Sequence, residues 1–114
     1  MRIQVKGRNG AIVDDEVRAR VEKKLAKVAR QVSPLAELEV ELREERNPSI
    51  KESQVAEATL HLKGVTLRAS ERSSDMGHSI NMMAEDLARQ VKKHRDKRRA
   101  RRESQRGQQP SAAG

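Results

Sequence analysis

Basic side chains recur at helical spacing in two stretches of the sequence. The first stretch lies on one flank of a helix predicted between residues 17 and 32. This flank carries Arg20, Lys23, Lys24, Lys27 and Arg30, and its only acid is Glu16, just before the stretch. A merely solvated helix face gains from interspersed charges and from ion pairs four residues apart. Segregation of five cations on one flank therefore favours contact with a polyanion.

The second basic stretch follows Ala88. Opposite the apolar stripe of a predicted helix lie Arg89, Lys92, Lys93 and Arg99, and from Arg95 onward cations surround the helix axis. Their mutual repulsion destabilises a helix, and a bound nucleic acid would compensate for it. An ion pair between Glu85 and Arg89 is the structural alternative for the beginning of this stretch. The candidate nucleic-acid-binding residues are Arg20, Lys23, Lys24, Lys27, Arg30, Arg89, Lys92, Lys93, Arg95 and Arg99.

The net charge is concentrated at one end of the chain. The 114 residues have a formal net charge of +8. Residues 1–88 hold 15 basic and 15 acidic side chains, whereas residues 89–114 hold 10 basic and 2 acidic ones. Contacts of such a segment with phosphates would dominate affinity and carry little sequence information.

The composition excludes several classes of function. The chain has no Phe, Tyr or Trp, so it lacks a base-stacking platform. It has no Cys for a thiol nucleophile or a cysteine-based metal site. His61, His78 and His94 are scattered, and we expect each at the surface. We therefore expect no enzyme, cofactor or metal. Without an apolar membrane span or signal peptide, a cytoplasmic protein without membrane contact is expected.

Residue periodicity predicts four strands and two helices. Alternating apolar residues indicate strands over residues 2–7, 36–46, 54–62 and 65–70, and Lys63-Gly64 fits a tight hairpin turn. Apolar residues at helical spacing from Val17 to Val32 indicate one helix, with Asp14 or Asp15 as its N-cap and Ser33-Pro34 as its stop. A second helix starts near Ser73 or Ser74, has Asp75 in its first turn, and buries Met76, Ile80, Met83, Leu87 and Val91.

This order predicts an α+β fold, a two-layer β-α-β-β-β-α sandwich with two helices on one face of a four-stranded mixed sheet. The first two strands should be parallel with a right-handed crossover, and the others an antiparallel meander. The predicted division is an α/β domain over 1–94, a basic helical extension over 95–106 and a disordered tail or linker over 107–114. Because Glu37, Glu39, Glu41 and Glu57 face outward from the sheet, nucleic acid is expected on the helical side.

Five short segments occur in the order of one known family: IQVKGRN, VEKKLAKVAR, VAEATLHLKGVTLRASE, Asp75-Met76 and LARQVKKHRDK. Together they resemble the ribosome hibernation-promoting factor family, also called ribosome-associated inhibitor or protein Y. The resemblance covers roughly residues 1–100 and implies that residues 1–94 are a ribosome-binding domain. The family's fold agrees with the one that periodicity predicts.

The resemblance implies binding to the small (30S) ribosomal subunit under stress, in the channel of messenger RNA and the A- and P-site transfer RNAs. Basic helices would contact 16S ribosomal RNA, compete with mRNA and tRNA, inhibit translation and stabilise idle ribosomes. By motif, Lys24, Lys27 and Arg30 match basic positions of the family's first helix, and Arg89 and Lys93 match those of its second. The sequence departs from the family at two positions, with Gly77 in place of an aromatic residue and Asp86 in place of a lysine.

The family has short members and long members, and the long ones add a linker and a C-terminal dimerisation domain. The ending GQQPSAAG resembles the start of such a linker, so we expect the N-terminal domain of a long form rather than a short member. Ribosome dimerisation is then expected only if a C-terminal domain is missing from this chain. Two alternatives stay open: a generic double-stranded-RNA-binding domain, and a basic protein-interaction module that binds an acidic partner.

Overall fold

The four strands and two helices follow one another in the predicted order, β-α-β-β-β-α. The computed structural model describes residues 1–47 and 49–108, with side chains described as far as Glu103. The strands are β1 (Arg2–Arg8), β2 (Glu37–Glu44), β3 (Gln54–Leu62) and β4 (Val65–Ser73), and the helices are α1 (Asp15–Gln31) and α2 (Met76–Gln108). The α+β class is therefore confirmed.

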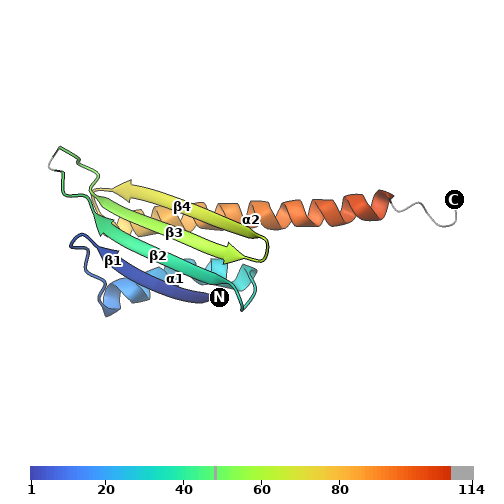
Figure 1. Ribbon diagram of the computed structural model, residues 1–114, viewed down its shortest axis with the longest axis horizontal. Coiled ribbons are helices and arrows are strands. Elements are labelled where there is room, and N and C mark those ends of the chain that lie inside the picture. Colours follow the sequence, from blue (N-terminus) through green and yellow to red (C-terminus); the bar gives the residue numbers. More distant parts are fainter. Residues whose placement is uncertain (48, 109–114) are drawn as a thin grey trace.

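The sheet has the strand order β1-β2-β3-β4. Strand β1 pairs with β2 in parallel, and the pairs β2–β3 and β3–β4 are antiparallel. Both helices lie against the same face of the sheet (Figure 1). The mixed sheet and the two-layer sandwich are thus confirmed, and one sheet face is left uncovered by helices.

An aspartate precedes each helix and satisfies one of its free backbone N–H groups. Val17 N donates to Asp14 Oδ1 at 2.9 Å, and His78 N donates to Asp75 Oδ2 at 3.0 Å. The prediction that Asp75 lies within the first turn of α2 is wrong, because that helix begins at Met76 and Asp75 caps it. The predicted end of the fourth strand at residue 70 is also too early. Its backbone stays paired up to Ser73, which is in register with Gln54.

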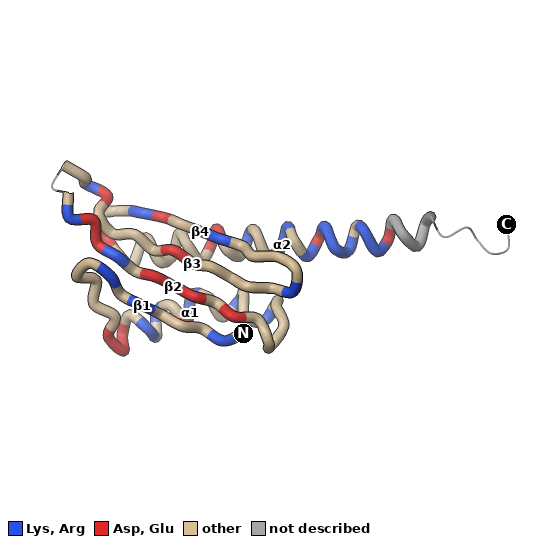
Figure 2. The backbone as a smooth tube through the Cα atoms, viewed as in Figure 1, with Lys and Arg blue, Asp and Glu red and all other residues tan. Residues whose placement is uncertain are grey.

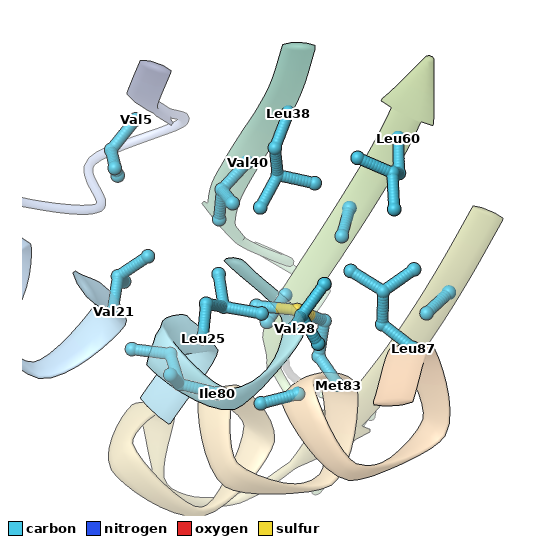
Figure 3. Packing of buried hydrophobic residues seen from close by; sticks show 14 of the residues in the cluster. Val5, Val21, Leu25, Val28, Leu38, Val40, Leu60, Ile80, Met83 and Leu87 are labelled. Atoms are coloured by element: carbon cyan, nitrogen blue, oxygen red, sulfur yellow. The ribbon is translucent and has the colours of Figure 1, made fainter. Parts of the chain in front are cut away.

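The core between helices and sheet is aliphatic (Figure 3). Val21, Leu25 and Val28 of α1 meet Ile80, Met83 and Leu87 of α2 beneath a sheet surface that includes Val5, Leu38, Val40 and Leu60. These helical residues are those whose spacing indicated an apolar stripe. Packing of both stripes on one sheet places the opposite flanks of the helices in solvent.

Helix α2 is longer than the domain that it packs on. Its last buried residue is Val91, 2% exposed, and residues 95–103 are all exposed. The helix nevertheless runs to Gln108 and extends beyond the sheet (Figure 1). It includes Gly107 and Gln108, which the sequence assigned to the tail, whereas residues 109–114 of that predicted tail lie outside the described residues. No helix in the described part of the chain is apolar over enough length to cross a bilayer.

Candidate nucleic-acid interface

All ten predicted nucleic-acid-binding side chains are exposed on the two helices. Helix α1 carries Arg20, Lys23, Lys24, Lys27 and Arg30, and α2 carries Arg89, Lys92, Lys93, Arg95 and Arg99. Figure 2 shows basic residues along the projecting part of α2 and acidic residues along β2. The structure brings the ten cations to the helical side but does not gather all of them in one place.

A groove of about 400 Å³ lies between the two helices. It is lined on one side by Lys24, Lys27 and Gln31 of α1, and on the other by Asn81, Ala84, Glu85, Ala88, Arg89 and Lys92 of α2. Four of these side chains are cationic and one is acidic. The groove between the helices, which we call the α1–α2 groove, is thus a basic cleft with small residues on its α2 side.

A second, more open hollow follows α2 away from the domain. Its lining residues are Arg89, Lys92, Lys93, Asp96, Lys97 and Ala100. Arg89 and Lys92 belong to both hollows. The basic surface is therefore continuous from α1, across the α1–α2 groove, and along the projecting part of α2.

The other predicted cations lie outside these two hollows. Arg20 packs at the start of α2, where a Cβ atom added to Gly77 would lie 2.7 Å from Arg20 Nη1. A glycine at this position leaves space for the guanidinium. Lys23, Arg30, Arg95 and Arg99 are exposed on their helices and line neither hollow.

The predicted cations are mostly unpaired. In the part of the chain described here, Arg89 alone among the ten has a carboxylate oxygen within 4.0 Å, that of Asp86 at 3.9 Å. The alternative of a Glu85–Arg89 ion pair is therefore wrong, because Arg89 approaches the carboxylate three residues earlier rather than four. Asp86, at which the chain departs from the family pattern, thus places a carboxylate beside one interface cation.

The outer face of the sheet is different. There the Arg43 guanidinium lies 2.7 Å from Glu57, 3.4 Å from Glu45 and 3.8 Å from Glu41. The hydrogen bond to Glu57 raises the pKa of Arg43, and the attraction of Glu57 and Glu45 acts in the same direction against desolvation. On this face, Arg43 thus has its counter-charges within the chain.

The three histidines do not form a site. His61 lies on the outer sheet face, 3.7 Å from Glu39, and His78 is exposed in the first turn of α2. His94 is partly buried on α2, so its predicted surface position is only partly correct. Among residues 1–47 and 49–108, no three His, Cys, Asp or Glu side chains are grouped so that they could hold a metal ion.

Five residues that line the α1–α2 groove are absent from the predicted site: Gln31, Asn81, Ala84, Glu85 and Ala88. The available signal was the spacing of three and four residues from Asn81 through Ala84 to Ala88. This spacing places an amide and two small side chains on one stripe of α2 beside the apolar stripe. It could have indicated a shallow helix surface, although not the partner that faces it.

Comparison with known proteins gives a consistent assignment. The family model described as "Sigma 54 modulation protein / S30EA ribosomal protein" matches residues 3–99. A ribosome hibernation promoting factor of Azotobacter vinelandii is 33% identical over 99 residues, covering 87% of this chain and 85% of the relative. Ribosome hibernation promotion factors of a Picosynechococcus species and of Staphylococcus aureus are 30% and 34% identical over 98 and 97 residues.

Coverage differs among these relatives. The matches include 85% and 83% of this chain but 50% and 48% of the Picosynechococcus and Staphylococcus proteins. The chain thus spans about half the length of these two relatives.

Two solved structures share the fold. The Thermus thermophilus Protein Y N-terminal domain has a TM-score of 0.69 at 28% identity, covering 82% of this chain and 99% of that one. A ribosomal subunit interface protein from Coxiella burnetii has a TM-score of 0.66 at 23% identity, covering 84% of this chain and 99% of that one. At this identity the likeness shows the fold alone. The resemblance to hibernation-promoting factors and protein Y is confirmed, and the chain belongs to the Sigma 54 modulation protein / S30EA ribosomal protein family.

Proposed function

We propose that this chain is a ribosome hibernation factor that binds the small (30S) ribosomal subunit through its helical face. The observation that carries the proposal is the continuous surface of cations on α1 and α2, most of which have no ion-pair partner among the described residues. Membership of the family, and relatives named as ribosome hibernation promotion factors, support the ribosome as the source of the polyanion. Such a factor acts in the cytoplasm.

The proposed contacts are with 16S ribosomal RNA. Lys24, Lys27, Arg89 and Lys92 would bind phosphates at the rim of the α1–α2 groove, and Lys93 would continue these contacts along α2. The remaining contributors are Arg20, Lys23, Arg30, Arg95 and Arg99. Release of condensed counterions would drive this binding, which makes it strongly dependent on salt and only weakly dependent on RNA sequence.

The proposed site on the subunit is the channel of messenger RNA and of the A- and P-site transfer RNAs. A domain that fills this channel blocks translation by exclusion, without any chemical step, and keeps an idle ribosome from engaging its substrates. No cofactor is needed for this mode of action. Pairing of ribosomes is not required by it.

Competition with initiator transfer RNA tests this proposal. Purified small subunits are sedimented with the protein, with initiator transfer RNA, and with both together at increasing concentrations of one of them. We expect each to displace the other. Simultaneous stoichiometric binding would overturn the channel assignment while leaving RNA binding intact.

Two further arms separate the alternatives. Equal affinity for an unrelated RNA duplex and for the small subunit would favour a generic double-stranded-RNA-binding domain. Sedimentation that survives nuclease digestion of the ribosomal RNA would favour a basic protein-interaction module. The proposed function requires preference for the intact subunit and loss of binding after digestion.

A further inference from the structure

Two amide side chains in the α1–α2 groove have hydrogen-bonding capacity that the chain leaves unused. The oxygens Gln31 Oε1 and Asn81 Oδ1 are closed to solvent, and no donor in the described part of the chain bonds to either. Both residues line the groove. A buried acceptor without a donor destabilises a fold by about 1–3 kcal/mol, so two at one cleft require an explanation.

The two amides lie toward opposite ends of the groove. Helix α1 follows β1 and α2 follows β4, and these two strands run in the same direction, so α1 and α2 also run in the same direction. Arg20 packs over Gly77 near the beginning of both helices. Asn81, four residues after Gly77, is therefore level with Lys24, four residues after Arg20. Gln31 follows seven residues later on α1, which corresponds to about 10 Å along the helix axis. One nucleotide can bridge such a distance between its ribose and the far edge of its base.

The surface between the amides is apolar and its rim is cationic. Ala84 and Ala88 stand one turn apart on α2, and their methyl groups leave room for a flat group above them. The Arg89 side chain is 70% exposed at the rim, and guanidinium planes can stack on unpaired bases as aromatic rings do. Ammonium groups of Lys24 and Lys27 lie on the α1 side for a phosphate.

We propose that the α1–α2 groove holds one unpaired nucleotide of an RNA strand, whose 2′-hydroxyl and exocyclic amino group donate to the two amide oxygens. The terminal torsions of Asn and Gln are broad, so either amide can turn its oxygen toward the groove when a donor arrives. The inference rests on the proposed function and adds to it a selectivity for RNA over DNA. Phosphate contacts alone do not supply that selectivity, because both polymers carry the same phosphates.

Binding of labelled oligonucleotides to the full chain tests the inference. Oligoadenylate RNA is compared at one salt concentration with the DNA of the same sequence, which lacks the 2′-hydroxyl. It is also compared with oligouridylate RNA, which lacks the exocyclic amino group. The variants Asn81→Leu and Gln31→Met replace each amide with an apolar side chain of similar shape. Gln4→Met is the matched control, since it removes an exposed amide on β1, away from the groove.

We expect the wild type and the Gln4→Met control to prefer oligoadenylate RNA over its DNA by about tenfold, the effect of a net hydrogen bond or two. In the two groove variants the preference should fall to about twofold or less. Their melting temperatures should be equal to that of the wild type or higher, because each substitution removes an unpaired buried acceptor. An unchanged RNA preference in both groove variants would overturn the inference and assign the amides to ordered waters.

A separate competition experiment distinguishes a nucleotide of an RNA strand from a free mononucleotide. If adenosine 5′-monophosphate displaces oligoadenylate at concentrations comparable to those of the oligonucleotide itself, the groove binds a free small molecule and the inference of an RNA strand is wrong. We expect the mononucleotide to compete at least about a hundredfold more weakly, since it lacks the flanking phosphates.

Failure of the inference can be told apart from failure of the proposed function. The variant Lys24→Glu/Lys27→Glu is sedimented with small subunits beside the two amide variants. If the charge reversals leave subunit binding unchanged, the proposed function fails. If they abolish it while the amide substitutions leave the RNA-to-DNA ratio intact, the helical face binds RNA and the nucleotide site alone is refuted.

Discussion

The two faces of this domain use charge in opposite ways. On the outer sheet face, Arg43 lies within 4.0 Å of three carboxylates, and His61 lies beside Glu39. On the helical face, nine of the ten predicted cations, all of them described residues, have no carboxylate within that distance. The difference teaches that pairing, more than the number of charges, separates a stabilising surface from a binding surface.

The local geometry of each element explains this difference. Facing residues of neighbouring strands lie about 5 Å apart, so Glu41 and Glu57, which are in register, both approach the Arg43 side chain. On the basic flank of α1, Arg20 and Lys24, and likewise Lys23 and Lys27, lie four residues apart and have the same sign. Strand pairing thus places carboxylates beside Arg43 on the sheet, whereas helical spacing places like charges side by side on the basic flank of α1.

Charge reversal on the helical face should have the largest effect. The triple variant Lys24→Glu/Lys27→Glu/Arg30→Glu is expected to weaken binding to the small subunit at least about a hundredfold, because each charge-assisted contact contributes about 1.5–3 kcal/mol. Sedimentation with purified subunits measures it. The matched control is Arg2→Glu/Lys6→Glu on the exposed face of β1, which should change binding little. The reverse ranking would show that the sheet, and not the helical face, binds the ribosome.

Removal of the projecting part of α2 should have the next largest effect. A chain that ends at His94 keeps every buried residue of α2, the last of which is Val91, and should melt within a few degrees of the full chain. It should bind less tightly by about tenfold at moderate salt. Its salt slope should be flatter by about 0.7–0.9 for each phosphate that the shortened helix no longer neutralises. A salt titration of ribosome binding, with thermal melting of both proteins, measures this.

Two outcomes would contradict this second prediction. An unchanged salt slope would mean that residues 95–106 do not contact RNA, so that the binding surface ends at the domain. A large drop in melting temperature would mean that the projecting helix stabilises the domain, although none of its residues from 95 to 103 is buried.

Neutralising the sheet's central cation should affect stability and not binding. Arg43→Gln leaves Glu41, Glu45 and Glu57 without their shared partner, which should cost up to about 1 kcal/mol in the free energy of unfolding. The Glu57 hydrogen bond raises the pKa of Arg43 above its ordinary value. This contribution is therefore present below the ordinary arginine pKa and is lost as the pH rises through the raised one. Urea denaturation measures the loss. A tenfold fall in subunit affinity would assign the sheet a share in binding.

The substitution Gly77→Ala should have the smallest effect. The added methyl group meets the flexible end of Arg20, whose guanidinium must shift while its charge stays, and it lies 3.2 Å from Asp75 Oδ2, which must give slightly. Helical Ala in place of Gly should raise the free energy of unfolding by up to about 1 kcal/mol. Subunit affinity should change less than twofold to threefold, and less than in Arg20→Gln. An affinity loss equal to that of Arg20→Gln would show that the position of this guanidinium, and not only its charge, matters.

Much of the fold follows from local spacing. Alternation on the strands and the repeat from Val21 through Leu25 to Val28 indicated which side chains are buried, and the structure buries them. The spacing of residues did not predict the end of a strand where that end has no apolar residue. The end of β4 is polar, and it stays in the sheet because Ser73 bonds to the buried Ser79, which donates to Gln54 O at 2.7 Å.

The alternating pattern also did not predict which residue is buried on the outer face of the sheet. Val55 belongs to the outward set of β3, yet it is fully buried. It is in register with Arg43 and Arg72, whose long side chains flank it on the neighbouring strands. Long charged residues can thus cover an apolar neighbour, and this depends on which strands pair.

For the candidate site, the sequence by itself determined which side chains carry the charge and that they share helix flanks, since helical spacing is a local property. Only the tertiary structure decided that Lys24 and Lys27 face Arg89 and Lys92 across a groove, that Arg89 meets Asp86, and that two amide oxygens are buried with no donor among the described residues. These features depend on how closely two helices that are far apart in the chain pack on one sheet. The spacing of residues within either helix carries no information about that distance.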